Sequence, residues 1–400
     1  MAAKREIREE ERKEQVATME EDRLTSLPDD LKICILSSLD LKDAVKTSVL
    51  SKSWVSIWTR IPVLKFHCYA FNKFNVFDDF VNKVLCLRDQ SATLEELTFQ
   101  HHCAACCENI LKKVFDYAFT HSVEELNVYI DNCRDGNWPV SLDDSSESST
   151  SLNLECVRHM SFRFLGLRSG SFKNLTDLEL DGATITDLEA FSGFPELKRL
   201  ILFNCDIDTE GEILRVNAPN LATLIISTSF HESFNCCDLT TPNLKIFCYE
   251  GIEFPRIQTH EALPVLETLC ISFLGMDYGT MDHMKEKRKF DDLFSMFCEF
   301  HNAKFVLLLS PVIALLYLYE DELVKRCPPF RKLKNLMLDF KGCKVWSSTI
   351  CSRIASNLKG YFLQNSPDAK FTMINSDVDE LQGNKLFADL LETSFSPLRK

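Results

Sequence analysis

A short apolar pattern recurs along this chain at a nearly constant period, and this repetition limits the possible folds more than any other feature. The pattern is L-x-x-L-x-L, and five consecutive copies, 22 to 24 residues apart, begin at Leu175, Leu197, Leu221, Leu244 and Leu266. The last two apolar positions are two residues apart, so in a strand they point to the same face. One such unit cannot bury its apolar face alone, but stacked copies can. The repetition therefore predicts an array of short parallel strands.

Further copies extend this array on both sides. Looser copies upstream and one clear copy downstream are Leu94-Leu97-Phe99, Val123-Leu126-Val128, Val157-Met160-Phe162 and Leu333-Leu336-Leu338. One more copy is expected around Val306 and Leu308, in the long gap before Leu333. A period of about 20–29 residues is typical of leucine-rich repeats. The sequence thus predicts an α/β fold, a leucine-rich-repeat solenoid of short parallel strands with helical or irregular connectors.

The residues upstream of the repeats, 24–58, carry a helical period instead. A stripe with i, i+4 spacing runs through Leu27, Leu31, Ile35 and Leu39. Pro28 suits the first turn of that helix, because its fixed φ is already helical.

Two more short helices are expected before Pro62. Asp40 is suited to cap the second helix, and the third begins near Ser51. The apolar residues that these two helices present are Leu41, Ala44, Val45, Val49, Trp54, Ile57 and Trp58. Three helices in about 40 residues are near the lower size limit for independent stability. We therefore expect a docking module rather than an enzyme.

These N-terminal residues resemble a known family. The segments Asp22-Arg23-Leu24-Thr25-Ser26-Leu27-Pro28-Asp29-Asp30-Leu31, Ile35-Leu36-Ser37-Ser38-Leu39 and Lys42-Asp43-Ala44-Val45-Lys46-Thr47-Ser48-Val49-Leu50-Ser51-Lys52, with Trp54 and Trp58, resemble a plant-type F-box. A box followed by repeats is similar to the plant F-box/leucine-rich-repeat proteins. The resemblance implies that the chain is a non-catalytic substrate-recognition subunit of an SCF-type E3 ubiquitin ligase.

In that family the box binds a Skp-type adaptor, which links to a cullin and a RING subunit, and the repeats bind the protein substrate. The residues expected to contact the adaptor are Leu27, Pro28, Leu31, Ile35, Leu36, Val45, Val49, Leu50, Trp54 and Trp58. Lys32, a charged position among them, is expected to contribute little.

The chain departs from the family pattern at two places. The family often has Leu-Pro where this chain has Leu39-Asp40, and Lys-Arg-Trp-Arg where this chain has Lys52-Ser53-Trp54-Val55. Losing two arginines removes charged contacts at the rim of an interface but leaves the apolar anchors. These departures keep open an alternative, an F-box/leucine-rich-repeat scaffold that does not assemble a ligase.

The same patterns predict the domain boundaries. We expect a charged flexible tail over 1–21, the F-box over 22–66, a linker or first repeat cap over 67–93, the leucine-rich-repeat domain over 94–376 and a C-terminal tail over 377–400. The polar residues 143–151 are expected to form a loop. Some relatives carry a further small domain after the repeats, but no convincing copy of it follows Ile374.

Composition bears on partners and compartment. The net charge of −14 lacks the basic footprint of a nucleic-acid binder. Seventeen cysteines without an apolar leader favour thiols in a reducing compartment, cytoplasmic and/or nuclear. The basic run 285–289 is more typical of a solvated loop than of a nuclear import signal. The apolar stretch Phe305–Tyr319 is too short to span a bilayer and is expected to be buried, so no membrane contact is predicted.

Motifs for chemistry are sparse. Phosphate-binding glycine loops, a G-x-S-x-G elbow and H-E-x-x-H are absent from the sequence. His101, His102, Cys103, Cys106 and Cys107 offer zinc-ligand types, but four ligands in seven residues would be cramped. The sequence therefore predicts no metal, no cofactor and no catalytic residue. A zinc protein or enzyme centred on these cysteines, and a small-molecule co-receptor, remain minor alternatives.

Overall fold

The computed structural model describes residues 24–374 apart from 25, 102–103, 132–150, 158–162, 165–173, 186–187, 229–233, 261–262, 275–282 and 342–346. The chain divides into two compact units, Met1–Gly136 and Asn137–Lys400. Both units mix helices with parallel strands, so the predicted α/β class is confirmed.

The first unit begins with short helices. They are α2 (Asp29–Ser37), α3 (Leu41–Lys46) and the 3₁₀ helices η1 (Thr47–Val49) and η2 (Ile57–Arg60). The third helix, predicted from Ser51, is instead a run of turns that ends in η2. Its four residues are too few for an α-helix of the predicted length.

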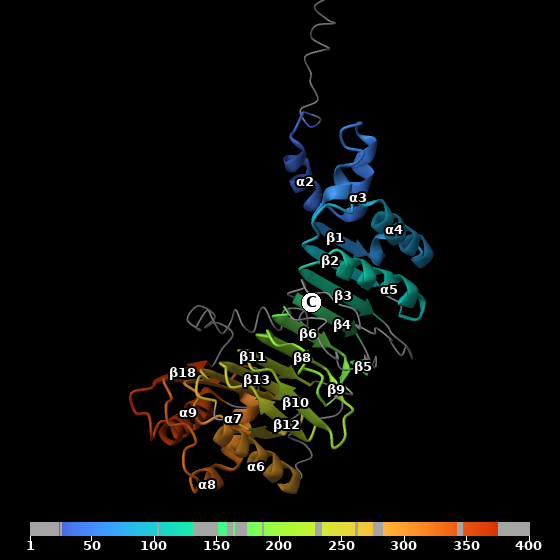
Figure 1. Cartoon of the computed structure of the whole chain (residues 1–400). Coiled ribbons are helices and arrows are strands. Elements are labelled where there is room, and N and C mark those ends of the chain that lie inside the picture. The colour runs from blue at the N-terminus through green and yellow to red at the C-terminus, as the bar shows by residue number, and fades with distance from the viewer. Residues whose placement is uncertain are drawn as a thin grey trace, which may run out of the picture. The chain divides into compact units, whose positions relative to one another are not determined.

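Three parallel strands follow in the same unit. They are β1 (Val63–His67), β2 (Glu96–His101) and β3 (Glu125–Asp131), and the intervening helices are η3 (Cys68–Ala70), α4 (Phe74–Leu87) and α5 (Ala104–Thr120). Leu64 of β1 pairs with Leu97 of β2, which pairs with Leu126 of β3. Leu64 and Phe66 of β1 therefore form one further copy of the repeat, which was not predicted because it lies within the predicted F-box. Figure 1 shows these strands beside α4 and α5.

The second unit is built on a larger parallel sheet. In spatial order its strands are β4 (Ser151–Val157), β6 (Asp177–Asp181), β8 (Arg199–Phe203), β11 (Thr223–Ser227), β13 (Ile246–Gly251), β15 (Thr268–Phe273), β16 (Phe305–Leu309), β17 (Asn335–Asp339) and β18 (Lys370–Ile374). Residues at the same position of the sequence repeat are paired between neighbouring strands. One such row across the sheet is Leu178, Leu200, Leu224, Phe247 and Leu269.

Three predictions about individual copies have different outcomes. The hidden copy is confirmed, because Val306 of β16 pairs with Leu269 and with Leu336. The copy at Val157-Met160-Phe162 is wrong, because the strand in register with β6 is 151–157 and places Leu152 beside Leu178. Met160 and Phe162 lie outside the described residues. Of the predicted loop 143–151, only Ser151 is described, and it is the first residue of β4. A further copy at β18, with Phe371 beside Leu336, was missed.

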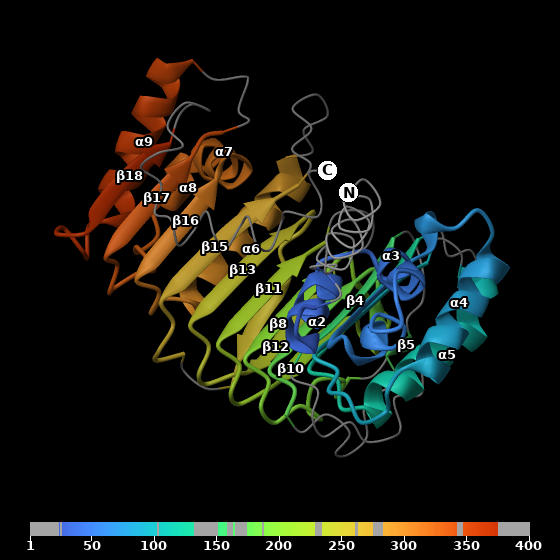
Figure 2. The same ribbon diagram turned by 90° about the horizontal axis from the view of Figure 1, so that it is seen from above.

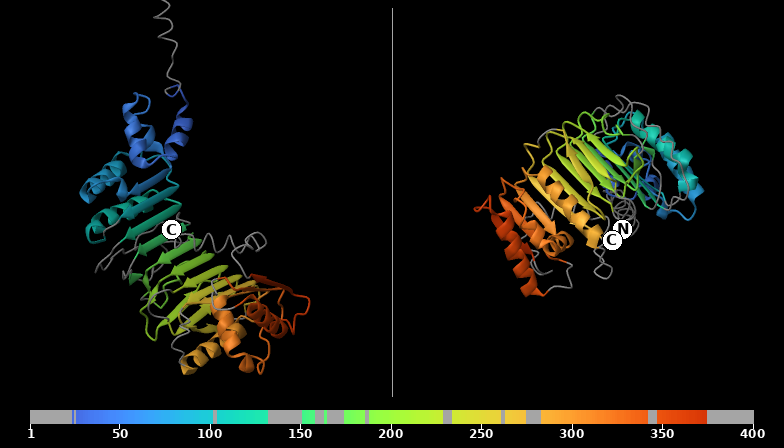
Figure 3. Two further views of the ribbon diagram at one scale, coloured as in Figure 1. Left: turned by 180° about the vertical axis from the view of Figure 1, so that it is seen from behind. Right: turned by 90° about the horizontal axis from the view of Figure 1, so that it is seen from below.

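Two small parallel sheets accompany the large one. Their strands are β5 (Arg163–Phe164), β7 (Thr184–Ile185) and β9 (Asp206–Ile207), and β10 (Ile213–Asn217), β12 (Cys236–Thr240) and β14 (Arg256–Thr259). The helices of this unit are α6 (His283–Glu299), α7 (Ser310–Leu318), α8 (Glu320–Leu323) and α9 (Ser348–Phe362). Figures 2 and 3 show them from further directions.

Two stretches singled out in the sequence lie in this helical part. The apolar stretch Phe305–Tyr319 forms β16 and α7, both largely buried, and Pro311 lies in the first turn of α7. The basic run 285–289 is not a loop, because it lies in α6. Lys289 is buried with its amine 3.3 Å from Glu286, and Lys287 lies 3.4 Å from Asp291.

The two faces of the large sheet have different partners. Leu200, Leu202, Leu224 and Phe247 are buried on one face, which we call the core face. Phe247 contacts Phe300, just beyond α6, with ring centroids 4.5 Å apart. Residues one position along each strand, such as Ile201 and Ile225, point to the opposite face.

The connectors are joined in the same repeating way. Asn220 donates a side-chain hydrogen bond to the carbonyl of Pro195 at 2.9 Å, and Asn243 repeats this bond to Pro219 at 2.9 Å. Each proline-containing connector is thus fixed to the next one, which helps to hold the strands in register.

We predict that Leu200→Ala and Leu224→Ala each lower the free energy of unfolding by about 2–5 kcal/mol, because each leaves a cavity on the core face. Urea unfolding followed by circular dichroism measures the change. Lys198→Ala, at an exposed neighbouring position, is expected to stay within about 0.5 kcal/mol of wild type. Thr223, which the pattern also places outside the core, is half-buried. Equal sensitivity of Leu200 and Lys198 would contradict the assigned strand faces.

Candidate functional site

Exposed apolar side chains gather in the N-terminal helices. Half of the large apolar side chains that are exposed in the described chain fall within residues 24–55. They are Leu24, Leu31, Ile35, Leu39, Val49, Leu50 and Val55, which we call the exposed apolar set. Val49 is 86% exposed and Leu50 is 60% exposed. A soluble chain rarely leaves so much apolar surface in one short segment without a binding role.

The interior of these helices is filled by other residues. Leu36, Leu41, Ala44, Trp54, Ile57 and Trp58 are buried. On α2, only Lys32 and Leu36 face inward, so the predicted stripe of Leu31, Ile35 and Leu39 is the outer side of the helix rather than its packing face. Because i, i+4 residues share one side of a helix, Leu31 and Ile35 present their side chains together.

The contacts of Lys32 show that it is not an exposed surface lysine. Lys32 is only 3% exposed. Its amine lies 3.7 Å from a carboxylate oxygen of Asp29 and 5.8 Å from the ring centroid of Trp54. Arg60 of η2 donates to the other oxygen of Asp29 at 2.6 Å. These charged contacts join the start of α2 to η2 and to the buried tryptophan.

Asp40 has a structural role at the first family departure. Its carboxylate accepts a hydrogen bond from the backbone N–H of Lys42 at 2.9 Å, so the predicted helix cap is confirmed. The cap satisfies one of the N–H groups that the start of α3 would otherwise leave without a partner. The amine of Lys42 donates to the carbonyl of Ala70 and lies 4.4 Å from the ring centroid of Phe71. Asp40 therefore supports the start of α3.

The predicted adaptor-binding residues fall into three groups. Pro28, Leu31, Ile35, Val49 and Leu50 are exposed, Leu27 and Val45 are half-buried, and Leu36, Trp54 and Trp58 are buried. The prediction omitted Leu24, Leu39 and Val55, which are exposed. Leu39 continues the i, i+4 series of Leu31 and Ile35, so its spacing could have placed it among the predicted adaptor-binding residues.

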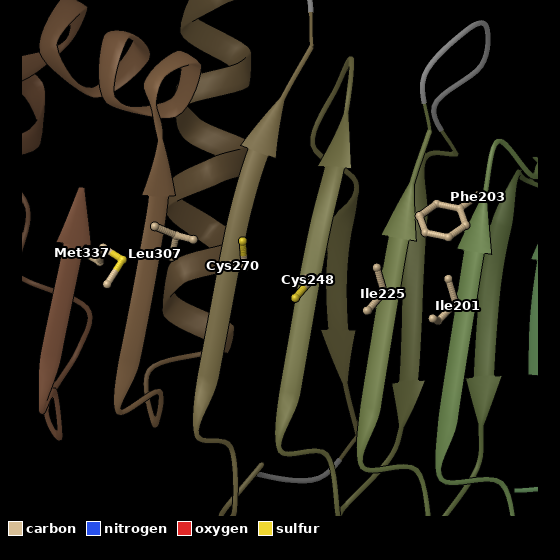
Figure 4. Close-up of a cluster of buried hydrophobic side chains, with 7 residues drawn as sticks. All are labelled: Ile201, Phe203, Ile225, Cys248, Cys270, Leu307 and Met337. Carbon is tan, nitrogen blue, oxygen red and sulfur yellow. The ribbon is translucent and has the colours of Figure 1, made fainter. Parts of the chain in front are cut away.

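A second candidate surface lies on the large sheet of the second unit, on the face opposite the core face. Its apolar residues are Ile201, Phe203, Ile225, Cys248, Cys270, Leu307 and Met337, which we call the apolar ladder. Figure 4 shows their side chains on one side of six neighbouring strands. Ile246, Leu309 and Ile374 pack against the ladder.

Acidic groups stand beside the ladder on the same face. Glu179 and Asp181 of β6 pair with Ile201 and Phe203 of β8. Burial raises the pKa of Glu179, and burial raises the pKa of Asp181 to about 6, although Asn204 donates a hydrogen bond to Asp181 at 3.0 Å. The charged form of Asp181 is therefore poorly solvated at this position.

The described cysteines do not form a metal site. No group of three or more histidine, cysteine and acidic residues is arranged for a metal in the described part of the chain. Cys103 lies outside that part, and the side chains of Cys106 and Cys107, at the start of α5, do so too. Burial raises the pKa of the Cys205 and Cys237 thiols well above the usual range, which makes both poor nucleophiles.

Among the described residues, none of the helices has the length and apolar composition needed to cross a bilayer.

We predict that Trp58→Ala lowers the free energy of unfolding by about 3–5 kcal/mol, because the ring is 7% exposed within the helical core. Val49→Ala is expected to change it by less than about 0.5 kcal/mol, because Val49 contacts mainly solvent. Chemical denaturation followed by tryptophan fluorescence measures both. A Val49 variant as unstable as the Trp58 variant would show that Val49 belongs to the core.

The raised pKa of Asp181 gives a pH dependence. The folded state holds a proton on Asp181 up to about pH 6, whereas an unfolded aspartate loses it near pH 4. Folding thus binds more protons in this window, so this group's contribution to stability falls as the pH rises from about 4 to about 6. We predict that Asp181→Asn gains stability relative to wild type above pH 6, measured by urea unfolding at pH 4.5 and pH 7.5. An equal difference at both pH values would contradict the assignment.

Comparison with known proteins identifies the N-terminal helices. The family model of the F-box domain matches residues 24–66. F-box/LRR-repeat protein 13 of Arabidopsis thaliana is 24% identical, covering 92% of this chain and 79% of the relative. F-box/LRR-repeat protein At3g26922 of the same plant is 28% identical, covering 56% of this chain and 80% of the relative. FBD-associated F-box protein At4g10400, also of this plant, is 23% identical, covering 90% of this chain and 78% of the relative. The resemblance predicted from the sequence is confirmed: the chain carries an F-box domain over residues 24–66 and is similar to F-box/leucine-rich-repeat proteins of a plant.

Proposed function

We propose that this chain is the substrate-recognition subunit of an SCF-type E3 ubiquitin ligase. The F-box would bind a Skp-type adaptor, and the repeats would hold a protein substrate for ubiquitination by the attached cullin-RING enzyme. Such a subunit contributes proximity and orientation and needs no catalytic residue of its own.

The exposed apolar set is the observation that carries the proposal. Val49, Leu50, Leu31 and Ile35 present apolar surface in the part of the chain that matches the F-box. A few apolar anchors of this kind usually supply most of the energy of a protein interface. Pro28, also exposed, stands at the N-cap of α2 with a fixed φ, so little entropy is lost when it docks.

Burial refines which residues would contact the adaptor. Leu36, Trp54 and Trp58 are buried against the neighbouring helices, so we assign them to shaping the surface rather than to touching the adaptor. Pro28, Leu31, Ile35, Val49 and Leu50 remain the proposed contacts, with Leu27 and Val45 at their margin. Leu39 and Val55 join them as exposed neighbours.

The parallel strands support the second half of the proposal. Their in-register pairing at the period of the sequence repeat is what a leucine-rich-repeat solenoid requires. We assign substrate binding to the sheet face that bears the apolar ladder, because the other face is filled by the core. The substrate would be an uncharged or basic segment, since Glu179 and Asp181 stand beside the ladder.

The alternative function, a scaffold that does not assemble a ligase, rests on the departures from the family pattern at Asp40 and Ser53. Both residues are half-buried, and serine in place of arginine at Ser53 would remove a charged contact at the rim of an interface. The binding test below separates the two functions.

We predict that Val49→Ala with Leu50→Ala weakens binding to a purified Skp-type adaptor by about tenfold to 10²-fold, or about 1.4–2.8 kcal/mol. Isothermal titration calorimetry with the full-length chain measures the affinity. Leu87→Ala is the matched control, because Leu87 is 64% exposed at the end of α4, outside the F-box match.

The outcomes divide as follows. If the wild-type chain binds no Skp-type adaptor, the ligase function is rejected and the scaffold takes its place. If wild type binds and the double variant binds equally well, the function stands but the assigned contacts are wrong. Equal losses in the double variant and in Leu87→Ala would show that the effect is not specific to the F-box.

A further inference from the structure

Two cysteines are neighbours in the middle of the apolar ladder. Cys248 of β13 and Cys270 of β15 are partners in the parallel register of these strands. Figure 4 shows both side chains on the same side of the two strands. Both are free thiols, and the residues are 6% and 5% exposed. The sheet therefore holds two thiols next to each other on one face, with a small part of each residue accessible to solvent.

The spacing of neighbouring strands suits a covalent bond between these two sulfurs. Neighbouring strands lie about 4.8 Å apart, and a disulfide joins residues whose Cα atoms are about 4.4–6.8 Å apart. Cys236 and Cys237 of β12 provide a contrast, because consecutive residues of a strand point to opposite faces. The strand register, and not nearness in the sequence, makes Cys248 and Cys270 a pair.

The two thiols also interact with each other. A hydrogen bond with Cys248 and burial raise the pKa of the Cys270 thiol, and the carboxylates of Glu250 and Asp339 raise it further. Glu250 lies two residues after Cys248 on β13, so the two share one face of the sheet. Cys270 therefore keeps its proton within the pair, which leaves the sulfur of Cys248 as the nucleophile.

We propose that Cys248 and Cys270 form a redox-modification site, at which hydrogen peroxide converts the two thiols to a disulfide that bridges β13 and β15. A small oxidant is required, because little of either residue is exposed. The bond joins strands that are already paired, and a thiol reductant can break it again.

The reaction has two steps and balances with one peroxide. The sulfur of Cys248 loses its proton and attacks one peroxide oxygen, the O–O bond breaks, and the released hydroxide takes up a proton to leave as water. This step gives a sulfenic acid at Cys248. The sulfur of Cys270 then attacks the sulfur of Cys248, the S–O bond breaks, and the hydroxyl group leaves with the proton of Cys270 as a second water. The thiol pair loses two electrons, and the peroxide gains them.

The bridge would change the centre of the apolar ladder. The ladder continues through Ile225 on the β11 side of the pair and through Leu307 on the β16 side. If the ladder holds the substrate, which rests on the proposed function, oxidation alters the middle of the substrate-binding face. The modification itself does not depend on that assignment.

Tryptic peptides make the bridge directly measurable. Cleavage after Lys245, Arg256 and Lys285 gives the peptides 246–256 and 257–285, each with one cysteine. The full-length wild type is treated with hydrogen peroxide, remaining thiols are blocked with N-ethylmaleimide, and the digest is analysed by mass spectrometry without reduction. We expect these two peptides to be linked, and the link to disappear after treatment with dithiothreitol.

Two serine variants test the order of the steps. In Cys270→Ser the hydroxyl group can replace the hydrogen bond with Cys248, but the second step is lost. Peroxide should then leave a sulfenic acid at Cys248, which dimedone traps and mass spectrometry detects. In Cys248→Ser, dimedone labelling of Cys270 should stay at background. Circular dichroism checks that both variants are folded.

Cys205→Ser is the matched control. Cys205 is 5% exposed, as Cys270 is, but its thiol donates to the backbone carbonyls of Leu180 and Phe203 instead of a cysteine. This variant should form the linked peptides at the wild-type rate, and Cys205 of the wild type should remain a thiol.

Oxidised wild type without the linked peptides would overturn the inference. Equal linkage of Cys205 to either cysteine would also overturn it, because bridging would then follow unfolding rather than strand register. The test uses no adaptor and no substrate, so its failure is independent of failure of the proposed function.

Discussion

The in-register pairing of parallel strands determines the second unit. Because each strand is joined to the next after 22 to 24 residues over the central repeats, a shift of one residue in any strand would move its leucines from the core face to the other face. Register is therefore strongly specified, and the buried line from Leu178 to Leu269 follows from it. The bonds from Asn220 and Asn243 to preceding prolines reinforce the same register in the connectors.

The chain has two distinct apolar surfaces, one in the F-box and one on the large sheet. In the F-box, so few residues are available that Trp54 and Trp58 fill the interior, while Val49 and Leu50 remain largely exposed. On the large sheet, the side opposite the core bears the apolar ladder. The first surface suits binding of a separate adaptor. The second is the sheet face that we assign to a protein substrate.

The sequence predicted the repeat well and the helices less well. Leucine spacing alone located β6, β8, β11, β13, β15 and β17, and it indicated β16 from Val306 and Leu308. It misplaced the copy at Val157, because two apolar patterns eight residues apart, one with Leu152 and one with Met160, fit the repeat there. Only the strand pairing, which places Leu152 beside Leu178, decides between them. For α2, the i, i+4 stripe identified the helix correctly, but spacing cannot tell an inward stripe from one kept for a partner. The burial of Lys32 could not be predicted either, since its contact with Trp54 is tertiary.

Hydrogen exchange of the full-length chain with and without a purified Skp-type adaptor tests the central claim most directly. The account predicts adaptor-induced protection in residues 24–55, greatest around α2 and from Val49 to Val55, and no change in β8 to β17. Absence of protection in residues 24–55, or protection on the large sheet instead, would contradict it.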